Sequence, residues 1–290
     1  MKPLVTIVTP SFQQGAYLED AIASVLAQDY PRIEYAVVDG GSTDGSADVI
    51  QRHADRLAWW VSQPDGGQAA ALNTAFARAQ GEILGWLAAD DTLLPGAVSR
   101  VVDALERSDA LLAYGDAMFV DREGREMFRL RARDPDVDAM QRACENFVVQ
   151  PGSLFRRRAY ELAGPFDEDA YYFFDFEFVL RVAEHGALLR LPDLLATYRV
   201  HDASKSIGAP VEKARDYVRI APRLPAAGAR TARRHAAEYF YEGLELREAR
   251  RLAFEARAPL LALKTLLPRP LVRRLRAHRR RASLVPSAPS

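Results

Sequence analysis

The chain has 290 residues, of which 49% are hydrophobic, enough to bury the core of one large α/β domain or two smaller ones, and this excludes a disordered protein. A single cysteine, Cys144, excludes an intramolecular disulfide and indicates a reducing compartment. The formal net charge of zero conceals an asymmetry: residues 1–209 carry 20 Lys/Arg and 32 Asp/Glu, and residues 210–290 carry 19 and 7. We expect an acidic main part that does not bind nucleic acid, and a basic extension that contacts something anionic.

No part of the chain has the pattern of a membrane span or a secretory leader. Every apolar run is soon interrupted by a charge, Gly or Pro, well short of the roughly 20 apolar residues that cross a bilayer. Residues 1–3 lead directly into an apolar run, without the charged region, long apolar region and cleavage site of a leader. We therefore expect a cytoplasmic protein.

The first 105 residues alternate β-branched runs with helical patterns, which predicts βαβ units and a mostly parallel sheet. The patterns predict strands at 4–8, 33–38, 57–61 and 83–87, helices at 17–28, around 49–50 and at 68–79, and a turn at 9–12. In open α/β sheets, ligands bind beyond the carboxyl ends of the strands. Because Asp39, Asp65 and the pair Asp90-Asp91 follow such strands, we expect these side chains to converge.

The later part of the chain is less regular. We expect a helix at 95–107, strands at 111–120 and 147–155, a flexible connection at 121–138, a helix at 172–184, short strands at 188–191 and 196–200, and helices from 211 onward. The last ten residues are rich in Ser and Pro, which predicts disorder. The change in charge and pattern predicts a main domain at 1–209 and a basic helical extension at 210–290.

The acidic pair at the end of the fourth strand supplies the ligand type that Mg²⁺ or Mn²⁺ prefers. Two adjacent acids also commonly cap a helix or face solvent, and an isolated Asp39 would be read as a turn former. The strand-end position favours a ligand site for both Asp39 and Asp90-Asp91. The glycines that follow Asp39 allow a ligand to approach the backbone closely.

Several segments together resemble the family 2 glycosyltransferases, which have the GT-A fold. They are residues 5–12 (VTIVTPSF), 24–28 (SVLAQ), 38–45 (VDGGSTDG), 62–68 (SQPDGGQ), 72–73 (LN) and 86–91 (WLAADD). The resemblance covers about residues 4–205 in order. It implies an α/β GT-A domain with a nucleotide-binding part at about 1–105, an acceptor part at about 106–209, and a helical C-terminal extension.

The resemblance also implies roles for individual residues on the donor side. The nucleotide-binding residues would be Thr9, Pro10, Ser11, Phe12, Asp39, Asp65, Gln68 and Asp90. The ligands of Mg²⁺ or Mn²⁺ would be Asp90, Asp91 and His201. Ala88 stands where many members have the first acid of a DXD motif, which leaves open how the two aspartates share the metal. For His201, a structural histidine is the alternative.

On the acceptor side, residues 164–168 (GPFDE) and 174–178 (FDFEF) resemble the acidic motif of these inverting enzymes. Asp175 is the candidate base, because transfer with inversion needs a carboxylate to remove a hydroxyl proton from the acceptor. A helix N-cap is the alternative role for Asp175, and both roles are compatible. Gln150 and Glu177 are candidates for contact with the sugar or the acceptor.

The resulting prediction is an inverting glycosyltransferase that moves a sugar from a UDP- or dTDP-type donor to a cell-surface glycan or a lipid-linked acceptor. One alternative is a catalytically silent sugar-nucleotide-binding protein of the same fold, which an intact Asp175 and His201 disfavour. Another is a dinucleotide-dependent oxidoreductase, which the absence of G-x-G-x-x-G in residues 9–15 disfavours. The segment 260–281 has eight Lys/Arg and no acid, which suits either an anionic membrane surface or a solvated helix packed on the domain.

Overall fold

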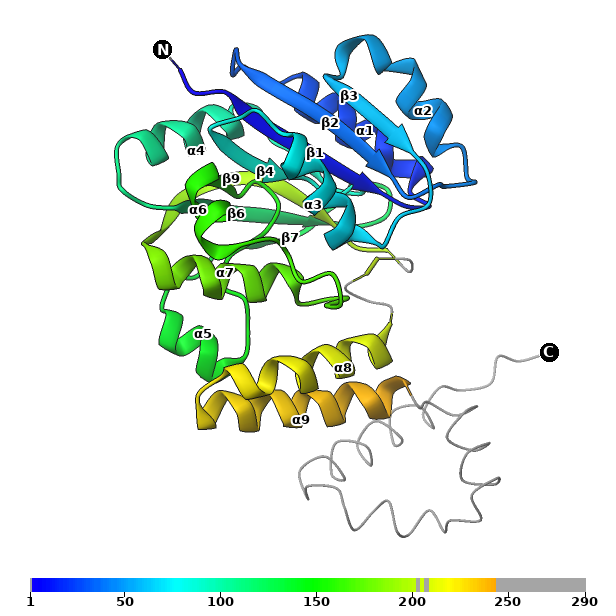
Figure 1. Ribbon diagram of the computed structural model, residues 1–290. Helices are drawn as coiled ribbons and strands as arrows, with labels where there is room; N and C mark the ends of the chain where they lie inside the picture. The colour runs from blue at the N-terminus through cyan, green and yellow to red at the C-terminus, as the bar shows by residue number, and fades with distance from the viewer. Residues whose placement is uncertain (1, 202–203, 206–208, 244–290) are drawn as a thin grey trace, which may run out of the picture.

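A twisted sheet with helices on both faces forms the main part of the molecule, and a pair of helices lies at one end (Figure 1). The computed structural model describes residues 2–201, 204–205 and 209–243. The strands are β1 Val5–Ser11, β2 Ile33–Asp39, β3 Trp59–Ser62, β4 Ile83–Trp86, β5 Thr92–Leu93, β6 Leu112–Val120, β7 Glu126–Leu130, β8 Leu154–Arg156 and β9 Leu188–Arg199. The helices are α1 Gly15–Leu26, α2 Ser46–Arg52, η1 Ala54–Arg56, α3 Gln68–Arg78, α4 Ala97–Glu106, α5 Val137–Ala143, α6 Arg157–Ala163, α7 Phe174–His185, α8 Pro210–Ile220, η2 Ala221–Arg223 and α9 Ala226–Gly243.

The strand order is β3-β2-β1-β4-β8-β6-β9-β5, with β7 paired to β6. Strands β1 to β4 are all parallel, as the alternation of strands and helices predicted. From β4 onward the sheet is mixed, because β8 runs antiparallel to β4 and β6, whereas β6 and β9 are parallel. The expected α/β architecture is confirmed, and the parallel half brings the carboxyl ends of β1, β2 and β4 to one edge.

Two of the expected boundaries in the sheet were wrong. The turn expected at residues 9–12 belongs largely to β1, which continues in register until Ser11 pairs with Asp39. The strands expected at 188–191 and 196–200 form one strand, β9, because shifts in its register with β6 absorb the residues between them. In both places the strand continues past the expected boundary.

The segments around β7 and β8 also differ from expectation. The connection expected at 121–138 contains β7, which folds back on β6 through a turn where the Asp121 carboxylate accepts the backbone N–H groups of Glu123 and Arg125. The strand expected at 147–155 shrinks to β8, because Gly152, with φ of +79°, turns the chain just before it. Residues 147–153 are therefore a loop that reaches the strand-end edge.

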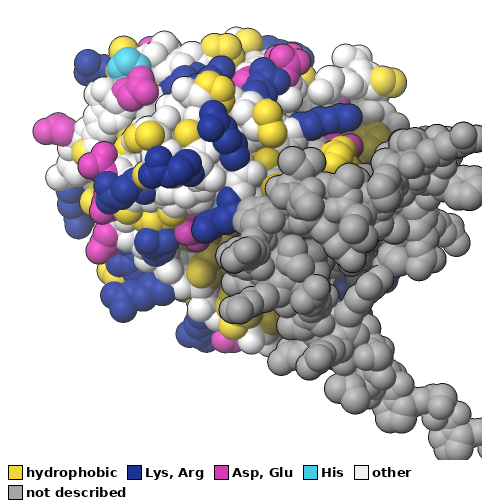
Figure 2. Space-filling model, turned by 90° about the horizontal axis from the view of Figure 1, so that it is seen from below, with side chains coloured by type: hydrophobic (Ala, Val, Ile, Leu, Met, Phe, Trp, Pro, Cys, Tyr) yellow, Lys and Arg dark blue, Asp and Glu magenta, His cyan; other side chains and the backbone are white. Residues whose placement is uncertain are grey.

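Helices α8 and α9 form an antiparallel pair that packs beside α5 and α7. All the exposed charged side chains of residues 210–240 are arginines, namely Arg215, Arg219, Arg223, Arg230, Arg233 and Arg234. Figure 2 looks at this end of the molecule and shows Lys and Arg side chains over the described surface, next to hydrophobic ones. Within the described residues, no helix is long and apolar enough to span a bilayer.

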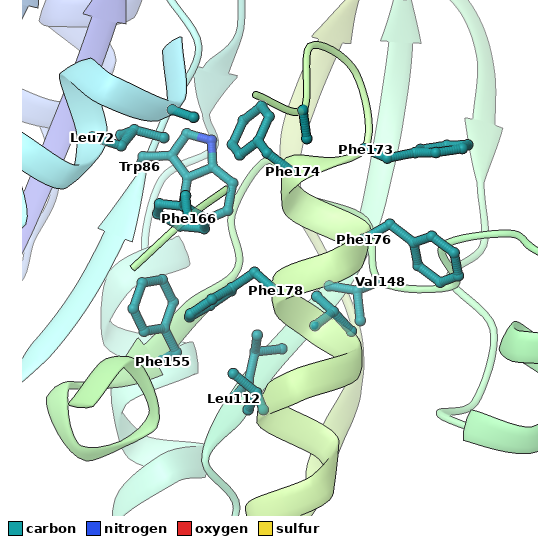
Figure 3. Close-up of a cluster of buried hydrophobic side chains, with 14 of the residues drawn as sticks. Leu72, Trp86, Leu112, Val148, Phe155, Phe166, Phe173, Phe174, Phe176 and Phe178 are labelled. Carbon is teal, nitrogen blue, oxygen red and sulfur yellow. The ribbon is translucent and has the colours of Figure 1, made fainter. Parts of the chain in front are cut away.

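An aromatic core holds α7 against the sheet. Phe174 and Phe178 point from α7 toward Trp86 and Phe166, and Phe176 points to the other side of the helix (Figure 3). The rings of Phe166 and Phe178 lie 4.6 Å apart, and those of Trp86 and Phe166 lie 5.2 Å apart. Because such rings interlock tightly, the first turn of α7 has a fixed position relative to the end of β4.

Candidate active site

Asp39 lies at the strand-end edge of the sheet, between the loop after β2 and the end of β3. Its side chain is fully buried and accepts hydrogen bonds from the Ser42 N–H (2.9 Å), the Ser42 hydroxyl (2.6 Å) and the Ser62 hydroxyl (2.7 Å). These bonds use three of the roughly four acceptor positions of a carboxylate. Asp39 therefore ties the glycine-rich loop after β2 to the end of β3.

The residues around Asp39 form the rest of this side. The hydroxyl of Ser11 is buried and has no hydrogen-bond partner within the described residues, although it lies beside Asp39 in the sheet. Phe12 is 62% exposed, and its ring reaches Gly40. Asp65 accepts a hydrogen bond from the Gly67 N–H (2.7 Å), and its carboxylate, like the ring of Phe12, lies close to Gly40. An exposed ring, an unpaired hydroxyl and a close-approach glycine lie together here.

Thr9 and Pro10 occupy a different position from the one expected for nucleotide contacts. Thr9 is fully buried, and its hydroxyl is 2.9 Å from the hydroxyl of Tyr35 in the core. Pro10 is a buried residue inside β1. The Thr9 side chain thus points into the core, because β1 continues past it, and the expected role of Thr9 and Pro10 in nucleotide binding stays a prediction.

Asp90 and His201 lie together at the end of β4 and the end of β9. Asp90 Oδ2 is 3.1 Å from His201 Nε2, and their side chains are 16% and 5% exposed. The ring of His201 lies 4.5 Å from that of Tyr17, which fixes its orientation. Arg199 supports the pair by donating its Nε–H to the Asp90 carbonyl (3.0 Å).

Asp91 has different surroundings from Asp90. Its side chain is buried, and Oδ1 accepts the Arg199 N–H (2.9 Å). Burial, reinforced by the charge of Asp90, raises the pKa of Asp91 well above its ordinary value. Asp91 thus joins the segment after β4 to β9.

These residues can supply only part of the coordination shell of a divalent cation. Among the described residues, no group of three or more His, Cys, Asp or Glu side chains is arranged to bind a metal ion. Asp90 and His201 offer one carboxylate and one imidazole at the expected place. Mg²⁺ sites commonly use one or two protein carboxylates and complete the shell with water and substrate phosphates. The residues present therefore fit a cation that arrives with a diphosphate.

Asp175 lies in the first turn of α7. Its Oδ1 accepts the Phe176 N–H (2.7 Å), and Oδ2 accepts a bond from the amide of Asn146 (3.3 Å). Helix α7 begins one residue earlier and its N-cap is Phe173, so Asp175 is a first-turn residue rather than the N-cap. Burial raises the pKa of Asp175 above its ordinary value.

Lys205 connects the two sides of the site and was missed in the sequence. Its Nζ donates to Gln68 Oε1 (3.0 Å) at the start of α3, and it lies 4.5 Å and 5.0 Å from the ring centroids of Tyr171 and Phe174. Burial lowers the pKa of Lys205 to about 8, although the charge of Asp175 opposes this effect. A single lysine after His201 carries no sequence signal that distinguishes it from a surface residue.

Gln150 and Glu177, the two residues expected to contact the sugar or the acceptor, lie in different surroundings. The Gln150 amide donates to the Trp86 carbonyl (2.8 Å) at the end of β4, which places it at the strand-end edge. Glu177 is bound to Arg181 (2.8 Å) and Arg223 (2.6 Å) and lines a hollow of about 840 Å³ that does not include Asp175. Two residues along a helix differ by about 200° in direction, so Glu177 lies on a different face of α7 from Asp175, and its contact with the sugar or the acceptor stays a prediction.

The first part of the chain matches a known protein family. The sequence model of the family described as "Glycosyl transferase family 2" matches residues 6–163, more than half of the chain. This chain belongs to the family 2 glycosyl transferases. The matched region contains Asp39, Asp65, Asp90 and Asp91, and Asp175 and His201 lie beyond it.

Relatives of this glycosyltransferase include an uncharacterised glycosyltransferase of Nostoc sp., alr2836, which is 30% identical over 216 residues, covering 71% of this chain and 67% of alr2836. TuaG of Bacillus subtilis, named for teichuronic acid biosynthesis, is 40% identical over 93 residues, covering 31% of this chain and 37% of TuaG. The chain therefore spans about two thirds of the first relative and little more than a third of the second.

Two solved structures share the fold of this glycosyltransferase. S. aureus TarS 1-349 in complex with UDP-GlcNAc superposes with a TM-score of 0.60 at 15% identity, covering 89% of this chain and 76% of that chain. A mannosyltransferase from Pyrobaculum calidifontis, in complex with GDP-Man and Mn²⁺, superposes with a TM-score of 0.58 at 22% identity, covering 93% and 82%. These likenesses confirm the GT-A architecture.

Proposed function

We propose that this glycosyltransferase moves a sugar, with inversion, from a nucleotide diphosphate donor to an acceptor hydroxyl. The observation that supports this proposal is that the loops tied together by Asp39, the Asp90–His201 pair and the half-buried Asp175 lie at one edge of the sheet. Lys205 joins the donor side to the acceptor side through Gln68, and its charge acts on Asp175. No other described part of the chain combines these groups.

Each group has a distinct task in this proposal. The loops held by Asp39 bind the nucleoside, with Ser11, Phe12 and Asp65 around it. Asp90 and His201 would hold Mg²⁺ or Mn²⁺, which would offset negative charge on the diphosphate. Asp175 accepts the proton of the acceptor hydroxyl while the oxygen of that hydroxyl bonds to the anomeric carbon of the donor sugar. The bond between that carbon and the diphosphate oxygen breaks on the opposite face, which inverts the configuration.

The donor is tested by calorimetric titration with UDP, dTDP and GDP and their hexose derivatives, with and without Mn²⁺. We favour a UDP- or dTDP-type donor, and the complexes of the structural neighbours, with UDP-GlcNAc and GDP-Man, justify including a purine. Binding of at least one nucleotide, strengthened by Mn²⁺, is the expected result. Absence of binding for the whole panel would contradict the proposal. A silent binding protein would bind a sugar nucleotide but never release the nucleotide diphosphate.

Substitution of the two adjacent aspartates tests the assignment of the metal. We expect Asp90→Asn to weaken the Mn²⁺-dependent part of nucleotide binding by roughly 10-fold or more, because a metal ligand is lost. The matched variant Asp91→Asn retains an oxygen that can accept the Arg199 N–H, so it keeps the Mn²⁺ effect. Equal losses in both variants would show that the aspartates share the metal.

We also propose that the acceptor is a cell-surface glycan or a lipid-linked glycan, and that the protein acts in the cytoplasm at the inner face of the membrane. The exposed arginines of α8 and α9 support this location, because basic side chains bind anionic lipid surfaces. The basic segment 260–281, for which the sequence also allows membrane contact, lies outside the described residues.

A further inference from the structure

A carboxylate from α8 holds the loop that leads into α7. Asp216 is buried, and it accepts the backbone N–H groups of three successive residues: Tyr171 (3.3 Å), Tyr172 and Phe173 (3.0 Å). Successive N–H groups that point inward form a concave anion-binding site. Here the anion is supplied by the chain itself, from a position more than 40 residues further along.

Two more contacts from α8 hold the same loop. The ring of Tyr217 lies 4.4 Å from that of Phe173, and Lys213 Nζ lies 4.8 Å from the centroid of the Tyr172 ring. Further along α8, Arg219 pairs with Asp167 (2.9 Å) and Asp169 (3.1 Å). The loop before α7 is therefore fixed by α8 along most of its length.

This loop determines where Asp175 lies. Phe173 is the N-cap residue of α7, and the carboxylate of Asp216 accepts the N–H of this residue and those of the two residues before it, so it holds the backbone that leads directly into the helix. Asp175 follows two residues later. Tyr171, the first anchored residue, and Phe174, which directly follows the last one, are the rings against which Lys205 lies. A shift of the loop would move both Asp175 and the environment of Lys205.

We propose that Asp216 is a positioning residue for the transfer reaction, which sets the place of Asp175 relative to the bound donor. The inference rests on the proposed function. It assigns a role in the reaction to α8, which lies outside the residues matched by the family. The boundary expected at residue 209 then separates side chains that act together.

The test compares Asp216→Asn, Asp216→Glu and Glu34→Gln in the full chain. Asparagine is isosteric, but its amide group cannot accept three N–H donors, whereas glutamate keeps the carboxylate. Glu34 is a matched control, because its carboxylate also joins distant segments, accepting the Gln80 N–H (2.8 Å) and the Thr6 hydroxyl at the opposite end of the strands. The substrate is the sugar nucleotide of the panel that the wild type binds, and water serves as the acceptor.

We expect Asp216→Asn to lower kcat for release of the nucleotide diphosphate by roughly 10- to 100-fold, because small displacements of a reacting group have effects of this size. The KM for the donor should stay within about two-fold, since the nucleotide loops are untouched. Asp216→Glu should recover part of kcat, and Glu34→Gln should lower Tm without changing kcat. An Asp216→Asn variant that loses Tm but keeps kcat would overturn the inference.

Amide hydrogen exchange provides a measurement that does not depend on the donor. In the wild type, the amides of residues 171–173 should exchange slowly, and in Asp216→Asn they should exchange at least about ten-fold faster, with α1 unchanged. Unchanged exchange would refute the role of Asp216 whatever the donor panel shows. If no sugar nucleotide binds but exchange responds as expected, the proposed function fails and the anchoring of the loop stands.

Discussion

At the residue scale, burial separates side chains that look equivalent in the sequence. Asp90 and Asp91 are adjacent and chemically identical, but Asp90 meets His201 whereas Asp91 binds the backbone of β9. Asp175 and Glu177 are separated in the same way, because one lies near Lys205 and the other is neutralised by two arginines. In each pair, the partner of the carboxylate decides its role.

Replacement of Asp175 by asparagine should stop turnover and stabilise the fold at neutral pH. The base is lost, so kcat should fall by roughly 100-fold or more. Burial raises the pKa of Asp175 above the ordinary 3.8. The ionised carboxyl therefore destabilises the folded state once the pH exceeds the ordinary pKa, and below that pH the penalty disappears. Tm should be higher than that of the wild type at pH 7, and the difference should shrink toward pH 3.5.

Nucleotide affinity is the control for the Asp175→Asn variant, and it should remain within about two-fold of the wild-type value. Retained release of the nucleotide diphosphate would remove Asp175 from the role of base. A lower Tm at pH 7 would instead show that its hydrogen bonds to Asn146 and Phe176 outweigh the cost of its burial.

At the scale of elements, the loops after β2 and β3 pack closely against each other. Gly41 has φ of +80°, and a Cβ atom there would lie 2.9 Å from the backbone nitrogen of Pro64. Asp39 directly precedes the first of these loops, and Asp65 lies in the second. Any side chain at Gly41 would separate the loops that we propose to bind the nucleoside.

Gly41→Ala and Gly45→Ala form a matched pair that tests this contact. Gly45 also has positive φ, but a Cβ atom there would meet nothing within 4 Å. Gly45→Ala should therefore cost only about 1–2 kcal/mol of unfolding free energy for the backbone conformation. Gly41→Ala should cost more and should also weaken nucleotide binding in calorimetry. Equal effects of the two substitutions on stability and affinity would show that the loop contact does not shape the site.

At the scale of the whole molecule, the acidic sheet domain and the basic C-terminal part differ in the partners that their charges favour. Replacing Arg230, Arg233 and Arg234 by serine should weaken sedimentation with phosphatidylglycerol vesicles, since each basic residue near a membrane contributes about 1 kcal/mol. Replacing Arg279, Arg280 and Arg281 tests the terminal segment in the same way. Phosphatidylcholine vesicles are the control. Unchanged binding in both variants, or equal binding to both lipids, would dismiss the membrane proposal.

The local features of the molecule could be predicted from sequence. Hydrophobic periodicity depends on neighbouring residues, so it located β2, α3 and β4 closely and placed Asp39 and Asp90 at strand ends. The family motifs then identified a glycosyltransferase. The pattern failed where tertiary contacts override local signals, as in the continuous β9 and the short β8.

Only the tertiary structure decided which polar groups meet. The pairing of Asp90 with His201 joins residues 111 positions apart, and that of Lys205 with Gln68 joins residues 137 positions apart. Such contacts depend on the path of the chain through the mixed half of the sheet, which local periodicity does not encode. The sequence by itself determined the fold class, the family and the strand-end aspartates. The structure alone showed that Asp91 turns inward and that Asp216 anchors the loop before Asp175, because burial and distance are properties of the folded chain.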